Sequence, residues 1–109
     1  MTGNEKQRLK AGNFVRNNGR VLRTINILRH KYNKLSGIQN VLENDGISQD
    51  EFLDAVNFLD LEGYIDLRDV ATKAPASLAD NHFETLEARL TGKGIRLLAG
   101  GIDDKMIEV

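Results

Sequence analysis

The chain contains no cysteine, which excludes disulfide bonds, thiolate chemistry and a cysteine-ligated zinc site. Its only two histidines, His30 and His82, lack a second histidine at the H-x-x-x-H spacing of a helical zinc site. We therefore expect neither a metal nor a cofactor.

Long hydrophobic runs are also missing. No stretch approaches the roughly 18 apolar residues that a membrane span requires. The basic N-terminus lacks the apolar segment of a signal peptide. We expect a cytoplasmic protein without a membrane partner. The 109 residues, 40% hydrophobic and 28% charged, suit one globular domain.

Catalytic signatures are scarce as well. The T-G-K-G of residues 91–94 lacks the preceding glycine and the spacing of a phosphate-binding loop. Glu84 and Glu87 flank a predicted strand without a pocket around them, and Ser36 and Ser48 are typical of helix caps. We predict that the chain is not an enzyme, and no small-molecule ligand is evident.

Charge is distributed very unevenly along the chain. Residues 1–34 hold nine Lys and Arg against one Glu, a net +8, and residues 35–109 hold six against fifteen acids, a net −9. The stretch "ISQDEFLDAVNFLDLEGYI" (residues 47–65) contains no Lys or Arg at all. Such segregation creates strong local potentials that the formal total of −1 conceals.

Apolar periodicity predicts three helices in the first half of the chain. Residues 1–18 are polar, basic and interrupted by Gly and Asn, which predicts a flexible arm. A first helix follows over residues 19–34, and Ser36 is expected to cap a short second one with Ile38, Val41 and Leu42 inward. Ser48 and Glu51 form an S-x-x-E capping box at the start of the third helix.

The second half predicts a β-hairpin and a last short helix. Residues 64–70 and 83–90 are expected to pair antiparallel across a mobile loop that contains Pro75 and Lys73. Alternation places Glu87 and Arg89 on the solvent face. Thr91 is expected to cap the last helix, and residues 102–109 form a tail. The predicted core consists of Val21, Ile25, Leu28, Tyr32, Phe52, Val56, Leu59, Ile65, Leu86, Leu90 and Leu97.

Two stretches carry a resemblance to a known family. "GISQDEFLDAVNFLDLEGYI" is similar to the third helix of a winged helix-turn-helix domain, and "ARLTGKGIRLLAGG" is similar to a wing strand that enters a last helix through an L-T-x-x-G turn. The order resembles MarR- and PadR-like regulators and, more specifically, small winged-helix proteins of Mu-like prophages. The tail "IDDKMIEV" departs from the proline-containing ends of the latter.

The resemblance implies an α+β, mainly helical fold with a two- or three-stranded β-wing over residues 19–101. It also implies a non-catalytic DNA-associated or transcription-regulatory protein of phage or mobile-element origin. In such domains the exposed face of the third helix enters the major groove. Here Asp50, Asp54 and Asp60 would repel phosphate, although first-turn acids such as Asp50 also complement the helix dipole. Gln49 and Asn57 remain as base readers.

Positive charge from the first helix and the arm is therefore expected to dominate any DNA contact. A helical wheel places Arg16, Arg20, Arg23, His30 and Lys34 along one ridge with Lys31 near it, and no acid interrupts them. Lys6, Arg8 and Lys10 of the arm would assist. The ridge is either a solvated face or a site for an anionic partner. The predicted nucleic-acid contacts are Arg16, Arg20, Arg23, Lys31, Lys34, Gln49, Asn57 and Lys73.

A protein-interaction module that does not bind DNA is the alternative. Leu53, Phe58 and Leu61 lie off the core face of the third helix and either meet a protein or pack beneath the wing or the arm. The partner would be another protein, or the acidic half of a second copy bound to the basic half of the first.

Overall fold

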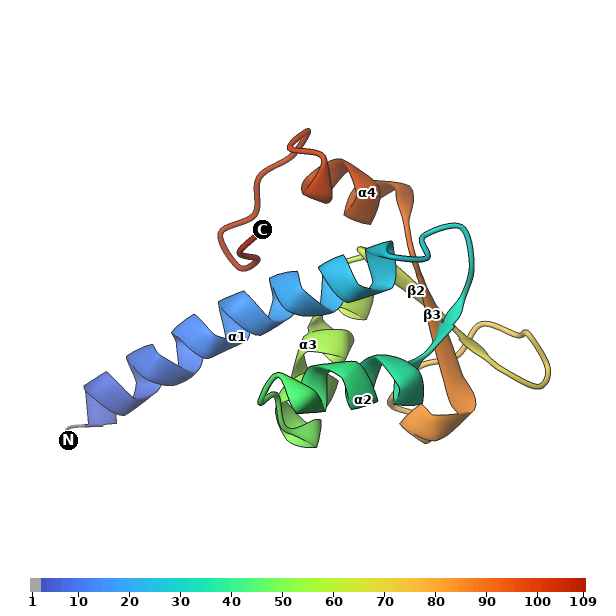
Figure 1. The fold of residues 1–109 in the computed structure, drawn as a ribbon, viewed down its shortest axis with the longest axis horizontal. Coiled ribbons are helices and arrows are strands. Elements are labelled where there is room, and N and C mark those ends of the chain that lie inside the picture. The colour runs from blue at the N-terminus through green and yellow to red at the C-terminus, as the bar shows by residue number, and fades with distance from the viewer. Residues whose placement is uncertain (1–2) are drawn as a thin grey trace.

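A computed structural model describes residues 3–109, without the side chains at positions 3, 4, 6 and 8. The helices are α1 (Gly3–Asn26), α2 (Leu35–Asn44), α3 (Gln49–Leu61) and α4 (Gly92–Leu98). The strands β1 (Asn33–Lys34), β2 (Ile65–Asp69) and β3 (Leu86–Leu90) form an antiparallel sheet in the order β1-β3-β2. The α+β class is confirmed, and the arrangement is compatible with a winged helix (Figure 1).

Helix α1 differs from its prediction at both ends. Residues 3–18, expected as an arm, continue the helix, whose N-terminal part projects beyond the other elements (Figure 1). A helix packed at one end extends at the low cost of propagation. The helix ends at Asn26, not near residue 34, because Asn33 pairs with Ala88 of β3. The side-chain amide of Asn33 also donates to the Leu28 and Lys31 carbonyls.

The early end of α1 overturns two predicted core positions. Leu28 is 56% exposed and Tyr32 only half-buried. The predicted cap of the second helix is also wrong, because α2 begins at Leu35 after Lys34 and has no side-chain cap. On α2 itself the prediction that Val41 points inward is wrong, because this residue is 52% exposed. Its predicted inward neighbours Ile38 and Leu42 are buried.

The predicted start of α3 is confirmed. The Glu51 amide donates to Ser48 Oγ at 3.2 Å, and the Ser48 amide donates to Glu51 Oε1 at 3.0 Å. Gly63 follows the helix at φ 78°, a conformation that suits glycine. This stretch therefore follows its local signals.

The predicted hairpin is confirmed, with Ile65 opposite Leu90 and Arg68 opposite Glu87. Its second strand starts at Leu86, because residues 83–85 form a 3₁₀ turn. Thr91 caps α4 as expected. Glu87, expected in solvent, is buried beneath two cations.

One core joins all the layers. Every predicted core residue except Leu28 and Tyr32 is buried. The C-terminal tail adds Ile107 and runs beside α1 (Figure 1). The Glu108 amide donates to the Val15 carbonyl at 3.1 Å, and Asn18 Nδ2 donates to the Met106 carbonyl at 2.9 Å. The tail is therefore part of the folded body.

Candidate nucleic-acid interface

The exposed face of α3 is acidic, as the sequence predicts. Gln49, Asp50, Asp54 and Asn57 are exposed. The Glu51 carboxylate takes part in the cap at the start of α3. Hydrogen bonds from the Ser48 backbone and hydroxyl lower its pKa. This face therefore offers two neutral amides between carboxylates, which is an unfavourable surface for phosphate.

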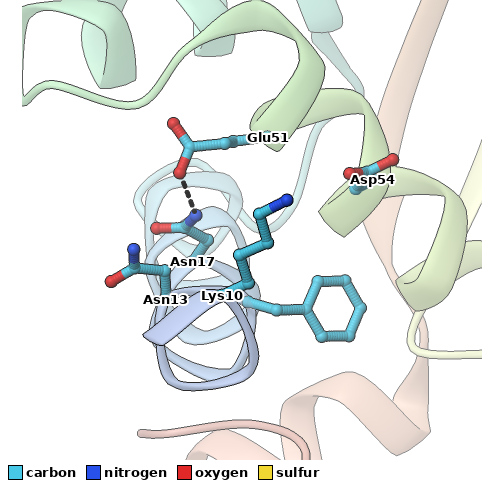
Figure 2. Close-up of a pocket in the computed structure, with 6 residues that line it drawn as sticks. Lys10, Asn13, Asn17, Glu51 and Asp54 are labelled. Atoms are coloured by element: carbon cyan, nitrogen blue, oxygen red, sulfur yellow. Dashed lines mark hydrogen bonds between the residues drawn. The ribbon is translucent and has the colours of Figure 1, made fainter. Parts of the chain in front are cut away.

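A groove of about 350 Å³ separates α3 from α1 and is lined in part by Lys10, Asn13, Asn17, Glu51 and Asp54 (Figure 2). Asn17 Nδ2 donates to Glu51 Oε2 at 3.4 Å, and the ammonium end of Lys10 reaches towards the space between the two carboxylates. Helix α1 thus covers one edge of α3. The side chains of Lys6 and Arg8 lie outside the described residues.

Two of the three predicted protein-interface residues are partly buried. The ring of Phe58 meets Phe14 edge-on, with centroids 5.3 Å apart, and is partly buried. Leu53 is also partly buried and packs against the core. Leu61 is 74% exposed at the end of α3. Leu53 and Phe58 therefore follow the alternative prediction, in which these side chains pack within the chain, against the core and the N-terminal part of α1.

The predicted basic ridge of the first helix does not exist as a continuous feature. Arg16 Nε lies 3.8 Å from Glu108 Oε2, and Arg23 Nη1 donates to the Glu108 carbonyl at 3.0 Å. Arg20 Nη2 lies 3.3 Å from Asp45 Oδ2. Arg16 and Arg23 contact the tail, and Arg20 contacts the α2–α3 turn. Each of these guanidinium groups therefore has a partner within the chain.

A different set of cations gathers on the solvent side of the sheet and in the turn before β1. The Tyr32 ring centroid lies 3.5 Å from Arg68 Cζ and 4.8 Å from Arg89 Cζ, which ties β2, β3 and this turn together. In the sheet register, Lys34 of β1 and Arg68 of β2 lie opposite Glu87, on either side of β3. We define the basic surface as Arg29, Lys31, Lys34, Arg68, Lys73 and Arg89.

Glu87 organises part of the basic surface. Its Oε2 accepts from Arg68 Nε at 2.6 Å and from Lys73 Nζ at 3.3 Å. Burial raises the pKa of Glu87, but these hydrogen bonds and the two charges outweigh burial and hold it below its ordinary value. The carboxylate therefore stays ionised and holds both cations in place.

A shallow hollow of about 410 Å³ lies beside this surface, lined in part by Arg29, His30, Asp66 and Arg89. Two guanidinium groups against one carboxylate leave an excess of positive charge there. The hollow therefore suits an anionic group such as a phosphate.

Three of the six residues of the basic surface are among the contacts predicted from the sequence. Lys31, Lys34 and Lys73 were predicted contacts, whereas Arg29, Arg68 and Arg89 were missed. Arg68 and Arg89 occupy outward positions of their strands, so the alternation of the hairpin was the signal that could have found them.

Acidification should test the role of Glu87. A carboxylate with a lowered pKa stabilises the folded state above its unfolded pKa, and that contribution is lost as pH falls through the folded value. We expect Glu87→Gln to lose stability relative to the wild type near neutral pH, and the difference to shrink below pH ~4. Thermal unfolding across this range measures it. A difference that is independent of pH would contradict the prediction.

No protein-family model, curated protein or solved structure matches the chain. Across residues 3–109, no helix has both the length and the apolar character needed to cross a membrane.

Proposed function

We propose that the chain is a non-catalytic DNA-associated protein of the winged-helix type, which contacts the duplex backbone through the basic surface. The observation that carries the proposal is the gathering of six cations from the turn before β1, β1 itself, both hairpin strands and the wing loop, against the two carboxylates of Glu87 and Asp66. The order of elements and the L-T-x-x-G turn support kinship with the winged-helix regulators and with the small proteins of Mu-like prophages.

The charge pattern also supports a particular orientation on DNA. The acidic face of α3 disfavours entry into the major groove, whereas the sheet side presents cations. Contacts to phosphate position a protein without reading sequence. We therefore propose binding that is salt-sensitive and weakly sequence-dependent.

The test is fluorescence anisotropy with random-sequence duplexes at low and moderate salt. Arg29→Ala combined with Arg89→Ala should weaken binding uniformly, by about 10-fold or more, because both residues line the hollow. The slope of log K against log salt should fall by about 0.9 for each lost phosphate contact. Unfolding temperatures check that the variant remains folded.

Matched controls separate the basic surface from the other candidates. Arg16→Ala with Arg23→Ala removes the same charge from the tail contact and should have the smaller effect. Asp54→Ala should leave binding unchanged or strengthen it. Failure to bind any duplex at low salt would refute the proposal. Loss of an operator preference in Asn57→Ala, with none of these effects in the Arg29/Arg89 variant, would instead assign DNA reading to α3.

The protein-interaction module remains the second candidate function, and exposed apolar side chains favour it. Leu61 is 74% exposed, and Ile27, Leu28 and Val41 are exposed on another part of the surface.

A further inference from the structure

An apolar groove of about 260 Å³ lies between the C-terminal end of α1 and α2. Its lining includes Ile27, Leu28 and Val41, which are 76%, 56% and 52% exposed. Helical periodicity assigns both Leu28 and Val41 to the core, yet the fold of one chain leaves them in solvent. An exposed cluster of this kind is typical of an interaction site.

The rim of this groove is positively charged. Lys34 lines it, and Arg29, His30 and Lys31 directly follow Leu28 in the same turn. The sequence from Ile27 to Lys34 contains no acid. A groove that is apolar inside and cationic at its edge fits an apolar side chain flanked by carboxylates.

The same chain displays such a segment at the end of α3. Leu61 is 74% exposed and lies between Asp60 and Glu62. We call these three residues the Leu61 tip. Asp60 is half-buried, and burial together with the nearby charge of Asp66 raises its pKa. Lys93 Nζ donates to the Glu62 carbonyl at 2.9 Å, so one cation borders the tip, and the carboxylates of Asp60, Glu62 and Asp66 outnumber it.

We propose that the Leu61 tip of one copy inserts into the Leu28 groove of a second copy. Leu61 would contact Leu28 and Val41, and Asp60 and Glu62 would face the cationic rim. Pairing of groove with groove across a two-fold axis is disfavoured, because it would bring two basic rims together. The contact is therefore heterologous, joining different surfaces of the two copies. It is also small, so we expect weak, salt-sensitive association.

Analytical ultracentrifugation over a wide range of protein concentrations tests the proposal. The wild type should rise in average mass above the 12.2 kDa of one chain, and more strongly at low salt. Val41→Asp disables the groove and Leu61→Asp disables the tip. Each variant should associate about 10–100-fold more weakly alone, since burial of a leucine is lost.

Mixing the two variants is the decisive measurement. Val41→Asp retains an intact tip and Leu61→Asp an intact groove, so an equimolar mixture should regain a one-to-one pair and nothing larger. Leu9→Asp is the matched control, because Leu9 is 58% exposed on α1 and should leave association unchanged. Circular dichroism verifies that each variant is folded.

Three outcomes would overturn the proposal: a wild type that stays monomeric at low salt, a Leu61→Asp variant that still associates, or a mixture that fails to pair. If Leu61→Asp still associates, the groove is the contact of a two-fold dimer. If the wild type stays monomeric, the partner of the groove is a different, acidic protein. All variants keep Arg29 and Arg89, so fluorescence anisotropy of each variant with duplex distinguishes a failure of self-association from a failure of duplex binding.

Discussion

Replacing Leu59 with alanine is expected to lower the free energy of unfolding by about 2–5 kcal/mol. Leu59 is fully buried in the core on the inner side of α3, and its carbonyl accepts from the Tyr64 amide where the chain enters β2. Alanine removes the apolar contacts and leaves a cavity that the surrounding helices fill only in part. Because small domains have about 5–15 kcal/mol in total, the variant should be close to unfolding.

Urea denaturation of both proteins measures this loss. Leu61→Ala is the control, because Leu61 lies two residues later on α3 and is 74% exposed. It should change stability by no more than about 0.5 kcal/mol. Similar losses in the two variants would contradict the assignment of Leu59 to the core.

Replacing Gly19 with alanine is expected to detach the C-terminal tail from α1. A Cβ at this position would lie 1.7 Å from the Glu108 carbonyl oxygen and 2.7 Å from its carbonyl carbon, both backbone atoms. The tail must move away, and the burial of Ile107 and the hydrogen bond from Arg23 would be lost. We expect a net loss of about 2–4 kcal/mol, although alanine itself favours a helix by about 1 kcal/mol.

Gly12→Ala is the control for this second prediction. It adds the same methyl group to the same helix, but nothing lies within 4 Å of the new Cβ. We expect it to stabilise the chain by about 0.5–1 kcal/mol. In a chain truncated before Met106, Gly19→Ala should behave like Gly12→Ala. A destabilising Gly19→Ala in the truncated chain would show that the clash is not with the tail.

Signals that act within a few residues were readable from the sequence. Ser48 and Glu51, and the Thr91 cap, depend on neighbours along the chain, and the structure has them as predicted. The hairpin followed from alternation and a turn. These features require no knowledge of distant residues.

Apart from the local cap predicted at Ser36, the errors arose where distant segments meet. Helix α1 ends at Asn26 because Asn33 pairs with Ala88, and its packing depends on a tail joined to Asn18 across 88 residues. No local pattern encodes either contact. The uneven charge of the two halves indicated strong local potentials. It could not indicate which cations would form ion pairs with carboxylates of the same chain. Arg16 pairs with Glu108 and Arg20 with Asp45, and Arg23 donates to the Glu108 backbone carbonyl.

The stacking of Arg68 and Arg89 about Tyr32 also equips the chain with an optical reporter. The chain has two tyrosines and no tryptophan, so tyrosine dominates its intrinsic fluorescence. Tyr64 is buried and donates to Asp104 Oδ2 at 2.5 Å, with its pKa raised to about 12 by burial and then by this carboxylate. Tyr32 lies among the cations instead. An anion that draws the guanidinium groups aside changes the surroundings of Tyr32, so unlabelled protein can be titrated directly. Lys93 Nζ lies 4.5 Å from the Tyr64 ring centroid, and Tyr32→Phe is therefore the blank that separates the two signals.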